Sequence, residues 1–358
     1  MDYNVLWFLI IGFLLVGYAI LDGFDLGVGA LHLFARGDHN RRLLLNSIGP
    51  VWDGNEVWLV TAGGALFAAF PHVYATAFSS FYLPFMLLLV ALIFRAVSIE
   101  FRSKEPGAAW RNAWDRGFSI GSIVAALLFG IAIGNVILGF PIGADKEFKG
   151  TFFDLISGYS LLTGLFNLVM FTMHGAIYLT LKTEGKLREQ VRGWAWRAYF
   201  LFVSLYAILT AITLYLRPEM LANFSFGYIE PTGTIHPLIK EYQVLISLIA
   251  WIVVALNFLA ILNISRTLSR HKYMQAFISS ALMMASIILF FALGLFPNMM
   301  VSNIDTLYNL DIYNSASSAY TLRVMFILAL IGLPFVIGYT SIIYWTYRGV
   351  TRLTDSSY

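Results

Sequence analysis

The chain has 358 residues, of which 59% are hydrophobic and only 12% are charged. Because a soluble domain carries about 25% charged residues, this composition excludes a protein that folds in bulk water. The chain contains no cysteine and has a formal net charge of only +3. These features exclude disulfides, thiolate metal sites, cysteine-based catalysis and a strongly basic surface for nucleic acid, so no nucleic-acid partner is predicted.

Apolar runs long enough to cross the hydrocarbon layer recur along the whole chain. They predict an all-α transmembrane helical bundle that forms a single domain over residues 1–358 and has about nine spans. The first run follows no Lys or Arg and has no small-residue cleavage site, so it is interpreted as a retained span in contact with membrane lipid. The predicted spans are residues 5–34, 51–70, 74–102, 115–140, 152–182, 194–216, 241–264, 272–299 and 318–347.

The basic residues predict the orientation of these spans. Most of the 23 Lys and Arg residues fall after the first, third, fifth and seventh spans and in the C-terminal tail. Because short loops rich in Lys and Arg stay in the cytoplasm, the C-terminus is predicted to be cytoplasmic and the N-terminus outside. The two longest outward connections, about 217–240 and 300–317, contain aromatic and turn-forming residues and are predicted to be structured caps.

Two acidic residues lie within the first predicted span, in the sequence DGFDLGVG. An ionisable side chain at membrane depth costs about 2.5–3.5 kcal/mol on insertion. Asp22 and Asp25 are three residues apart and share a helix face, while Gly23, Gly27 and Gly29 allow a neighbouring helix to approach closely. This pair suits a proton relay, a cation site or an ion pair with nearby basic residues. The alternative is that the acids only cap or pair with an Arg at the cytoplasmic end.

A second polar cluster opens the second predicted span, in the sequence PVWDGNEVW at residues 50–58. Asp53 and Glu56 lie where the positive end of the helix dipole favours anions. Trp52 and Trp58 suit interfacial anchors, which is the commoner role of membrane tryptophans. Anchoring does not account for two acids with an amide, Asn55, between them.

The connection between the third and fourth predicted spans is rich in charge. Arg95 is placed to neutralise an acid of the first span, and Asp115 lies at the predicted opening of the fourth span, where the helix dipole favours it. Lys104 and Arg111 are interpreted as solvated side chains of the loop.

Two histidines fall within predicted spans, His32 near the end of the first and His174 in the fifth. Neither has a second His or a Glu three or four residues away, which is the spacing of metal sites on helices. Ordinary hydrogen bonding is therefore predicted for both, and no metal or cofactor ligand is predicted in this chain.

The first third of the chain contains the segments DGFDLGVG, NSIGPVWDGNEVWLVTAGGALFAAFP at 46–71, FYLPFMLLLVALIFRAVSIEFRSK at 81–104 and WRNAWDRG at 110–117. These segments resemble subunit II of cytochrome bd-type quinol oxidases. The resemblance implies a respiratory oxidase of the bacterial or archaeal cell membrane that oxidises quinol and reduces dioxygen to water. It also implies a subunit I partner that holds b-type and d-type haems, possible small single-span accessory subunits and a possible structural quinone in this chain.

The resemblance also implies roles for individual residues. Asp25 and Asp53 are assigned to a route that brings cytoplasmic protons toward the haems, with Asp22 and Glu56 as secondary candidates. Trp58 is assigned to the mouth of an oxygen channel. Structural roles are predicted for Trp52, Arg95 and Asp115.

Two other functions are kept as alternatives. Buried carboxylates in glycine-broken helices are also typical of a stand-alone ion-coupled transporter. The second alternative function is a purely structural anchor, in which the acids are only salt-bridge partners.

Overall fold

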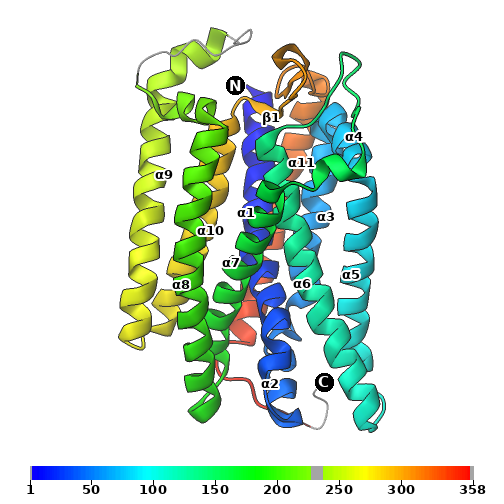
Figure 1. Ribbon diagram of the computed structural model, residues 1–358, viewed down its shortest axis with the longest axis vertical. Coiled ribbons are helices and arrows are strands. Elements are labelled where there is room, and N and C mark those ends of the chain that lie inside the picture. Colours follow the sequence, from blue (N-terminus) through cyan, green and yellow to red (C-terminus); the bar gives the residue numbers. More distant parts are fainter. Residues whose placement is uncertain (1, 227–236, 355–358) are drawn as a thin grey trace.

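The computed structural model describes residues 2–226 and 237–354 and is a bundle of long helices that run nearly parallel (Figure 1). The first helix begins at the top of Figure 1 and the last ends near the bottom. The long helices are α1 (Tyr3–Leu31), α3 (Trp52–Ala69), α5 (Tyr82–Phe101), α6 (Ala108–Leu138), α7 (Gly158–Lys182), α8 (Gly185–Leu216), α9 (Pro237–Ser269), α10 (Tyr273–Leu295) and α11 (Ala319–Thr346). The shorter elements are η1 (His32–Phe34), α2 (Asp38–Ile48), α4 (Pro71–Ser80), η2 (Phe152–Leu155), η3 (Pro218–Phe224), β1 (Asn298–Met300), η4 (Thr306–Tyr308) and β2 (Leu310–Asp311).

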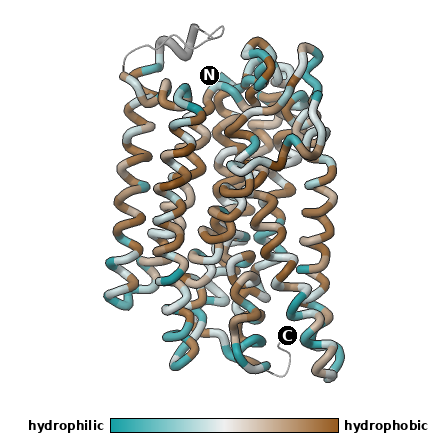
Figure 2. Tube along the Cα trace, viewed as in Figure 1, coloured by the Kyte–Doolittle hydropathy of each residue, from teal (hydrophilic) through white to brown (hydrophobic). Residues whose placement is uncertain are grey.

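The protein is a multi-pass membrane protein. Within the described residues, 8 helical segments are long and apolar enough to cross a membrane: α1 together with η1, and each of the helices α5 to α11. Hydrophobic residues fill the middle of the bundle and hydrophilic residues gather toward its two ends (Figure 2). Helix α3 occupies the predicted second span but is not among the 8, because the polar residues Asp53, Asn55 and Glu56 near its start lower its mean hydropathy.

The structure corrects the boundaries of several predicted spans. The predicted helix at 74–102 is divided at Phe81 into α4 and α5, because Pro84 has no backbone N–H to donate to the carbonyl of Ser80. Helices α6 and α8 begin at Ala108 and Gly185, well before the predicted starts, because their first turns are polar and hydropathy detects only the apolar part. Helix α2 was not predicted for the same reason.

Helix α7 lies at the centre of the bundle, where it packs against α1, α6, α8 and α10. Its side chains are the most completely buried among the 8 spans. A Cβ atom on Gly27 of α1 would lie 1.9 Å from the carbonyl oxygen of Phe171, and one on Gly175 would lie 2.6 Å from the backbone of Gly27. The close crossing of α1 and α7 therefore requires glycine on both helices.

One of the two predicted caps lies wholly within the described residues. Strands β1 and β2 pair antiparallel in the segment 300–317 and its flanks, and this small sheet is an exception to the all-α prediction. Thr76 donates to the carbonyl of Lys146, and Lys146 Nζ donates to the carbonyl of Asn314, both at 2.7 Å. The other cap, about 217–240, is described only in part: η3 lies within it, and residues 227–236 lie outside the described residues.

Candidate functional site

A buried ion-pair network joins α1, α3 and α5. Asp22 and Arg95 are both fully buried, and Arg95 Nη2 donates to Asp22 Oδ1 at 2.9 Å. The other terminal nitrogen of Arg95 donates to Glu56 of α3, whose side chain is 24% exposed. The structure therefore brings Arg95 to an acid of the first span, as the sequence indicated, and adds an acid of the second.

The charges of this network do not balance. Asp25 lies one helical turn beyond Asp22 and is also 0% exposed. Full ionisation of Asp22, Asp25 and Glu56 beside the single guanidinium of Arg95 would leave two uncompensated negative charges inside the bundle. Binding a proton within the network reduces that charge, so the arrangement is suited to taking up and releasing protons.

The carboxylate of Asp25 is held by one side chain. Asn55 Nδ2 donates to Asp25 Oδ2 at 2.7 Å, and Tyr344 of α11 donates its hydroxyl to Asn55 Oδ1 at 2.9 Å. Among the described residues, the other carboxylate oxygen, Asp25 Oδ1, has no hydrogen-bond partner. A buried acceptor without a partner costs about 1–3 kcal/mol, and protonating the carboxylate turns one of its oxygens into a donor.

The two principal proton-route candidates lie in different surroundings. Asp53 is in the first turn of α3, as predicted, and is exposed. Asp25 is enclosed by the bundle. The described contacts do not bring these two residues together. Trp52, next to Asp53, is half-buried and packs against the main core.

Trp58 packs inside the protein and does not stand free as an interfacial anchor. It is 8% exposed, and a Cβ atom on Gly17 of α1 would lie 2.3 Å from its ring. The ring of Phe13 meets it edge-on, with centroids 5.9 Å apart. The glycine at position 17 therefore makes room for the indole between α1 and α3.

A second ion network lies toward the end of the bundle where α2 is found. His32 Nε2 and Arg102 Nε each lie 2.6 Å from Asp115 Oδ1, and Arg41 Nη1 donates to Asp115 Oδ2 at 3.0 Å. The dipole explanation predicted for Asp115 is wrong, because α6 begins at Ala108 and Asp115 is not in its first turn. Its burial among basic side chains accounts for it instead.

Asp38 extends this second network to α2. Arg102 Nη2 donates to Asp38 Oδ1 at 2.7 Å, and Arg111 Nη1 donates to Asp38 Oδ2 at 3.3 Å. Arg111 is therefore not only a solvated loop side chain, as the sequence indicated, whereas Lys104 is exposed. Burial alone would lower the pKa of Arg102, but its hydrogen bonds to Asp115 and Asp38 raise that pKa above its ordinary value. The network ties together η1 at the end of α1, the end of α5 and the starts of α2 and α6.

The histidines of the spans do not fit a haem or metal ligand set. His174 Nδ1 lies 2.7 Å from Ser280 Oγ, and its Nε2 lies 3.1 Å from the carbonyl oxygen of Ile20, so both ring nitrogens are engaged. His32 is fully buried against Asp115. In the described part of the chain, no group of three or more His, Cys, Asp and Glu side chains is placed to hold a metal ion.

Sequence reasoning missed several contributors to these networks, among them Tyr344 and Arg41. Tyr344 lies 289 residues from Asn55, and no local pattern indicates that α11 passes beside α3. Arg41 belongs to α2, which hydropathy does not detect. The signal that was present is the amide of Asn55 between the two acids of α3.

The fold and the two networks define a polytopic helical membrane protein with ionisable groups enclosed between its spans. The family model described as cytochrome bd terminal oxidase subunit II matches residues 3–347. The chain belongs to this family, whose members are subunits of respiratory terminal oxidases, and the resemblance in the first third of the sequence is confirmed over the whole chain.

Three relatives illustrate the match. The chain is 37% identical to cytochrome bd-I ubiquinol oxidase subunit 2 of Escherichia coli (strain K12), with 100% of both chains covered. It is 34% identical to cytochrome bd ubiquinol oxidase subunit 2 of Bacillus subtilis (strain 168), over 96% of this chain and 95% of that one. A chain in the structure of the bd oxidase from Geobacillus thermodenitrificans has the same fold, with a TM-score of 0.75, 18% identity, and coverage of 97% of this chain and 99% of that one.

Proposed function

We propose that this chain is the subunit of a quinol oxidase that carries protons from the cytoplasm to the oxygen-reducing centre, with Asp25 as the residue that accepts and releases them. The observation that carries the proposal is the burial of Asp25 in a network with more carboxylates than cations, with one oxygen held by Asn55 and the other without a partner. Reduction of dioxygen to water consumes protons, so a buried carboxylate that can take up and release a proton has a chemical task in such a complex.

The haem chemistry is assigned to the partner subunit. The engaged histidines His32 and His174 support placing the b-type and d-type haems in subunit I, where the haems would supply the electron transfer between quinol and dioxygen. Helix α11, whose most apolar window has no buried residue in this chain, offers a large face to such a partner or to lipid. The resemblance alone carries two further proposals: a structural quinone bound to this chain and small single-span accessory subunits.

The membrane topology completes the proposal. We place the chain as a single domain in the bacterial or archaeal cell membrane, with α3 as a ninth span, the N-terminus outside and the C-terminus in the cytoplasm. In support, α2 with its basic residues and the end of α11 lie at one end of the bundle, and the start of α1 lies at the other (Figure 1). By the preference of Lys and Arg for cytoplasmic loops, the end that holds α2 faces the cytoplasm.

The proposal gives each of these polar residues a role. Arg95 pairs with both Asp22 and Glu56, whereas Asp25 has no ion-pair partner among the described residues and is therefore the group that takes up the proton. Asn55 fixes one oxygen of Asp25 and so orients the other. Asp53, on the exposed surface of α3, is the other acid of the proposed proton route, and Trp58 lies at the mouth of an oxygen channel, as the resemblance implies.

The test compares two carboxyl-to-amide variants in the complex purified by a tag on this chain. Asp25→Asn should lower oxygen consumption about 100-fold, since a positioned proton-transfer group contributes about 10²–10⁴ in rate, while the haem absorption spectrum persists. Glu105→Gln changes an exposed loop acid in the same way and should leave the rate unchanged. Wild-type oxygen consumption in Asp25→Asn would remove the proton assignment.

A further inference from the structure

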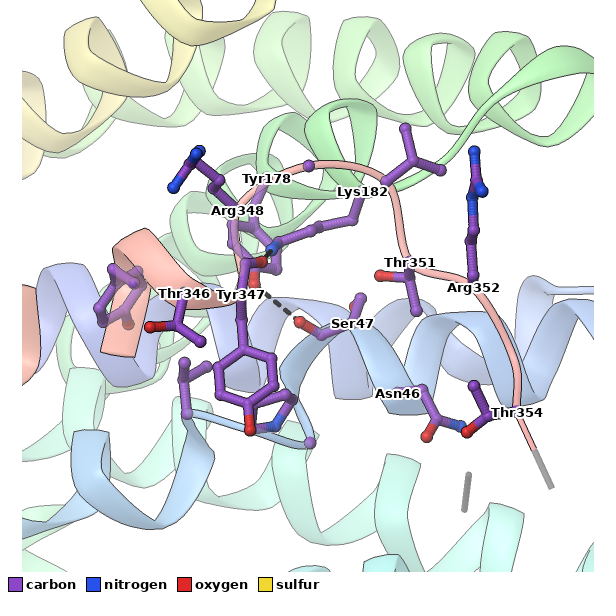
Figure 3. A pocket seen from close by; sticks show the side chains of 16 residues that line it. Asn46, Ser47, Tyr178, Lys182, Thr346, Tyr347, Arg348, Thr351, Arg352 and Thr354 are labelled. Atoms are coloured by element: carbon purple, nitrogen blue, oxygen red, sulfur yellow. Dashed lines mark hydrogen bonds between the residues drawn. The ribbon is translucent and has the colours of Figure 1, made fainter. Parts of the chain in front are cut away.

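A cavity of about 470 Å³ lies at the end of the bundle where the chain leaves α11 (Figure 3). Its walls come from the end of α2 and the turn that follows it, from the last turns of α7 and from the end of α11 with the tail beyond it. A single water molecule needs only about 10–15 Å³ of such space. The cavity therefore has room for a cluster of water molecules.

The tail forms a roof that is fixed to α7 by hydrogen bonds. Thr351 N donates to the carbonyl of Lys182 at 2.9 Å, and Lys182 Nζ donates to the carbonyl of Tyr347 at 2.6 Å. The walls include polar residues, with Asn46 and Ser47 from α2 and Thr351 from the tail lining the cavity (Figure 3). Polar walls and a held roof are the conditions under which buried water stays ordered.

The basic residues of this cavity do not converge on a single point. In Figure 3 the side chains of Arg348 and Arg352 extend away from each other. The guanidinium of Arg348 lies over the ring of Trp345, 3.8 Å from its centroid, and donates to the carbonyl of that residue. Lys182 is engaged by the tail. The geometry thus favours a water-filled space over a binding site for an anion.

The inner wall of the cavity connects it to the buried acid. Tyr344 lines the cavity and donates its hydroxyl to Asn55 Oδ1 at 2.9 Å. Asn55 in turn donates to Asp25 Oδ2 at 2.7 Å. Only one side chain, Asn55, therefore separates the residue at the cavity wall from the carboxylate to which a proton route is assigned.

We propose that this cavity is the aqueous entrance through which cytoplasmic protons reach Asp25, and that Tyr344 is the positioning residue at its inner end. Water in the cavity carries the proton from the cytoplasm to the wall. Tyr344 holds Asn55, and Asn55 in turn keeps the carboxyl group of Asp25 oriented toward the cavity. The inference rests on the proposed function of Asp25. The rival entrance is the exposed surface at Asp53, on the first turn of α3.

The chain contains no cysteine, so a single introduced thiol reports on the cavity. In the purified complex, Thr351→Cys places that thiol on the cavity wall, and Ser269→Cys places a matched one on an exposed residue at the end of α9. Each variant is labelled with a bulky cationic methanethiosulfonate reagent and compared with itself before labelling. Labelling Thr351→Cys should lower oxygen consumption about tenfold, a part of the 10²–10⁴ that a proton-transfer group contributes, and labelling Ser269→Cys should not change it.

Two results separate failure of the entrance from failure of the proton role. If Asp25→Asn slows turnover but labelled Thr351→Cys keeps its rate, protons enter elsewhere and this inference is overturned while the proposed function stands. If Asp25→Asn turns over at the wild-type rate, both are overturned.

Tyr344→Phe tests the positioning role, because it keeps the ring and removes only the hydroxyl that holds Asn55. It should slow turnover and increase the solvent isotope effect in deuterated water while leaving the KM for quinol unchanged. A merely structural loss would not raise the isotope effect. A wild-type rate and isotope effect in Tyr344→Phe would overturn the assignment.

Discussion

Replacing Arg95 by Met would leave two acids without their shared cation. Asp22 is fully buried beside Arg95, with the two charged groups 2.9 Å apart. At an effective dielectric constant of about 20, charges about 4 Å apart attract by about 4 kcal/mol, and removing one partner of a buried pair costs about 3–5 kcal/mol. Glu56 is partly exposed and regains water, so the loss falls mainly on Asp22. We therefore expect Arg95→Met to destabilise the protein by about 3–5 kcal/mol.

The assay is thermal unfolding of the purified complex at one fixed heating rate, because large membrane complexes unfold irreversibly. Arg111→Met removes a half-exposed cation from Asp38 and should cost about 0–1 kcal/mol. The double variant Asp22→Asn with Arg95→Met should be more stable than Arg95→Met alone, since it also removes the stranded charge. Equal unfolding temperatures for Arg95→Met and Arg111→Met would refute the reasoning.

Two further predictions concern packing and pH. Gly27→Ala would place a Cβ 1.9 Å from the Phe171 carbonyl oxygen and should destabilise the protein by about 1–3 kcal/mol in the same unfolding assay. The control variant Gly63→Ala meets open space and should be neutral. Equal effects of the two variants would contradict the packing prediction. Hydrogen bonds from Thr151 lower the pKa of Asp154, so its stabilisation is present above the unfolded pKa of about 3.9 and is lost as the pH falls through the lower folded value. Asp154→Asn should therefore lower the unfolding temperature at neutral pH but not in strong acid, and a difference that persists in acid would contradict the assignment.

Much of the bundle could be predicted because the bilayer constrains it strongly. Apolar runs of about 20 residues must form helices, and 8 such helices are present among the described residues. The pairing of Arg95 with Asp22 could be predicted too, because an acid and a base at membrane depth each require a partner. The glycines of the first span indicated a close crossing, and Gly27 is where α1 meets α7.

Other features could not be predicted because they depend on contacts between distant segments. The partners of Asp115 come from η1, from α2 and from the end of α5, and only the folded chain places His32 and Arg102 beside it. Hydropathy does not detect α2, because the exposed face of this helix is polar. The hydrogen bond between Tyr344 and Asn55 depends on where α11 crosses α3. The residues of α3 give no indication that α11 lies beside them, and the residues of α11 give none for α3.

The central claim, that protons reach the oxygen-reducing centre through Asp25, is tested most directly by following proton uptake from the medium with a pH indicator during a single turnover of the complex. In Asp25→Asn, uptake should slow about 100-fold relative to the wild-type complex, while the haem spectrum of the reduced complex is preserved. Uptake at the wild-type rate in Asp25→Asn would contradict the account.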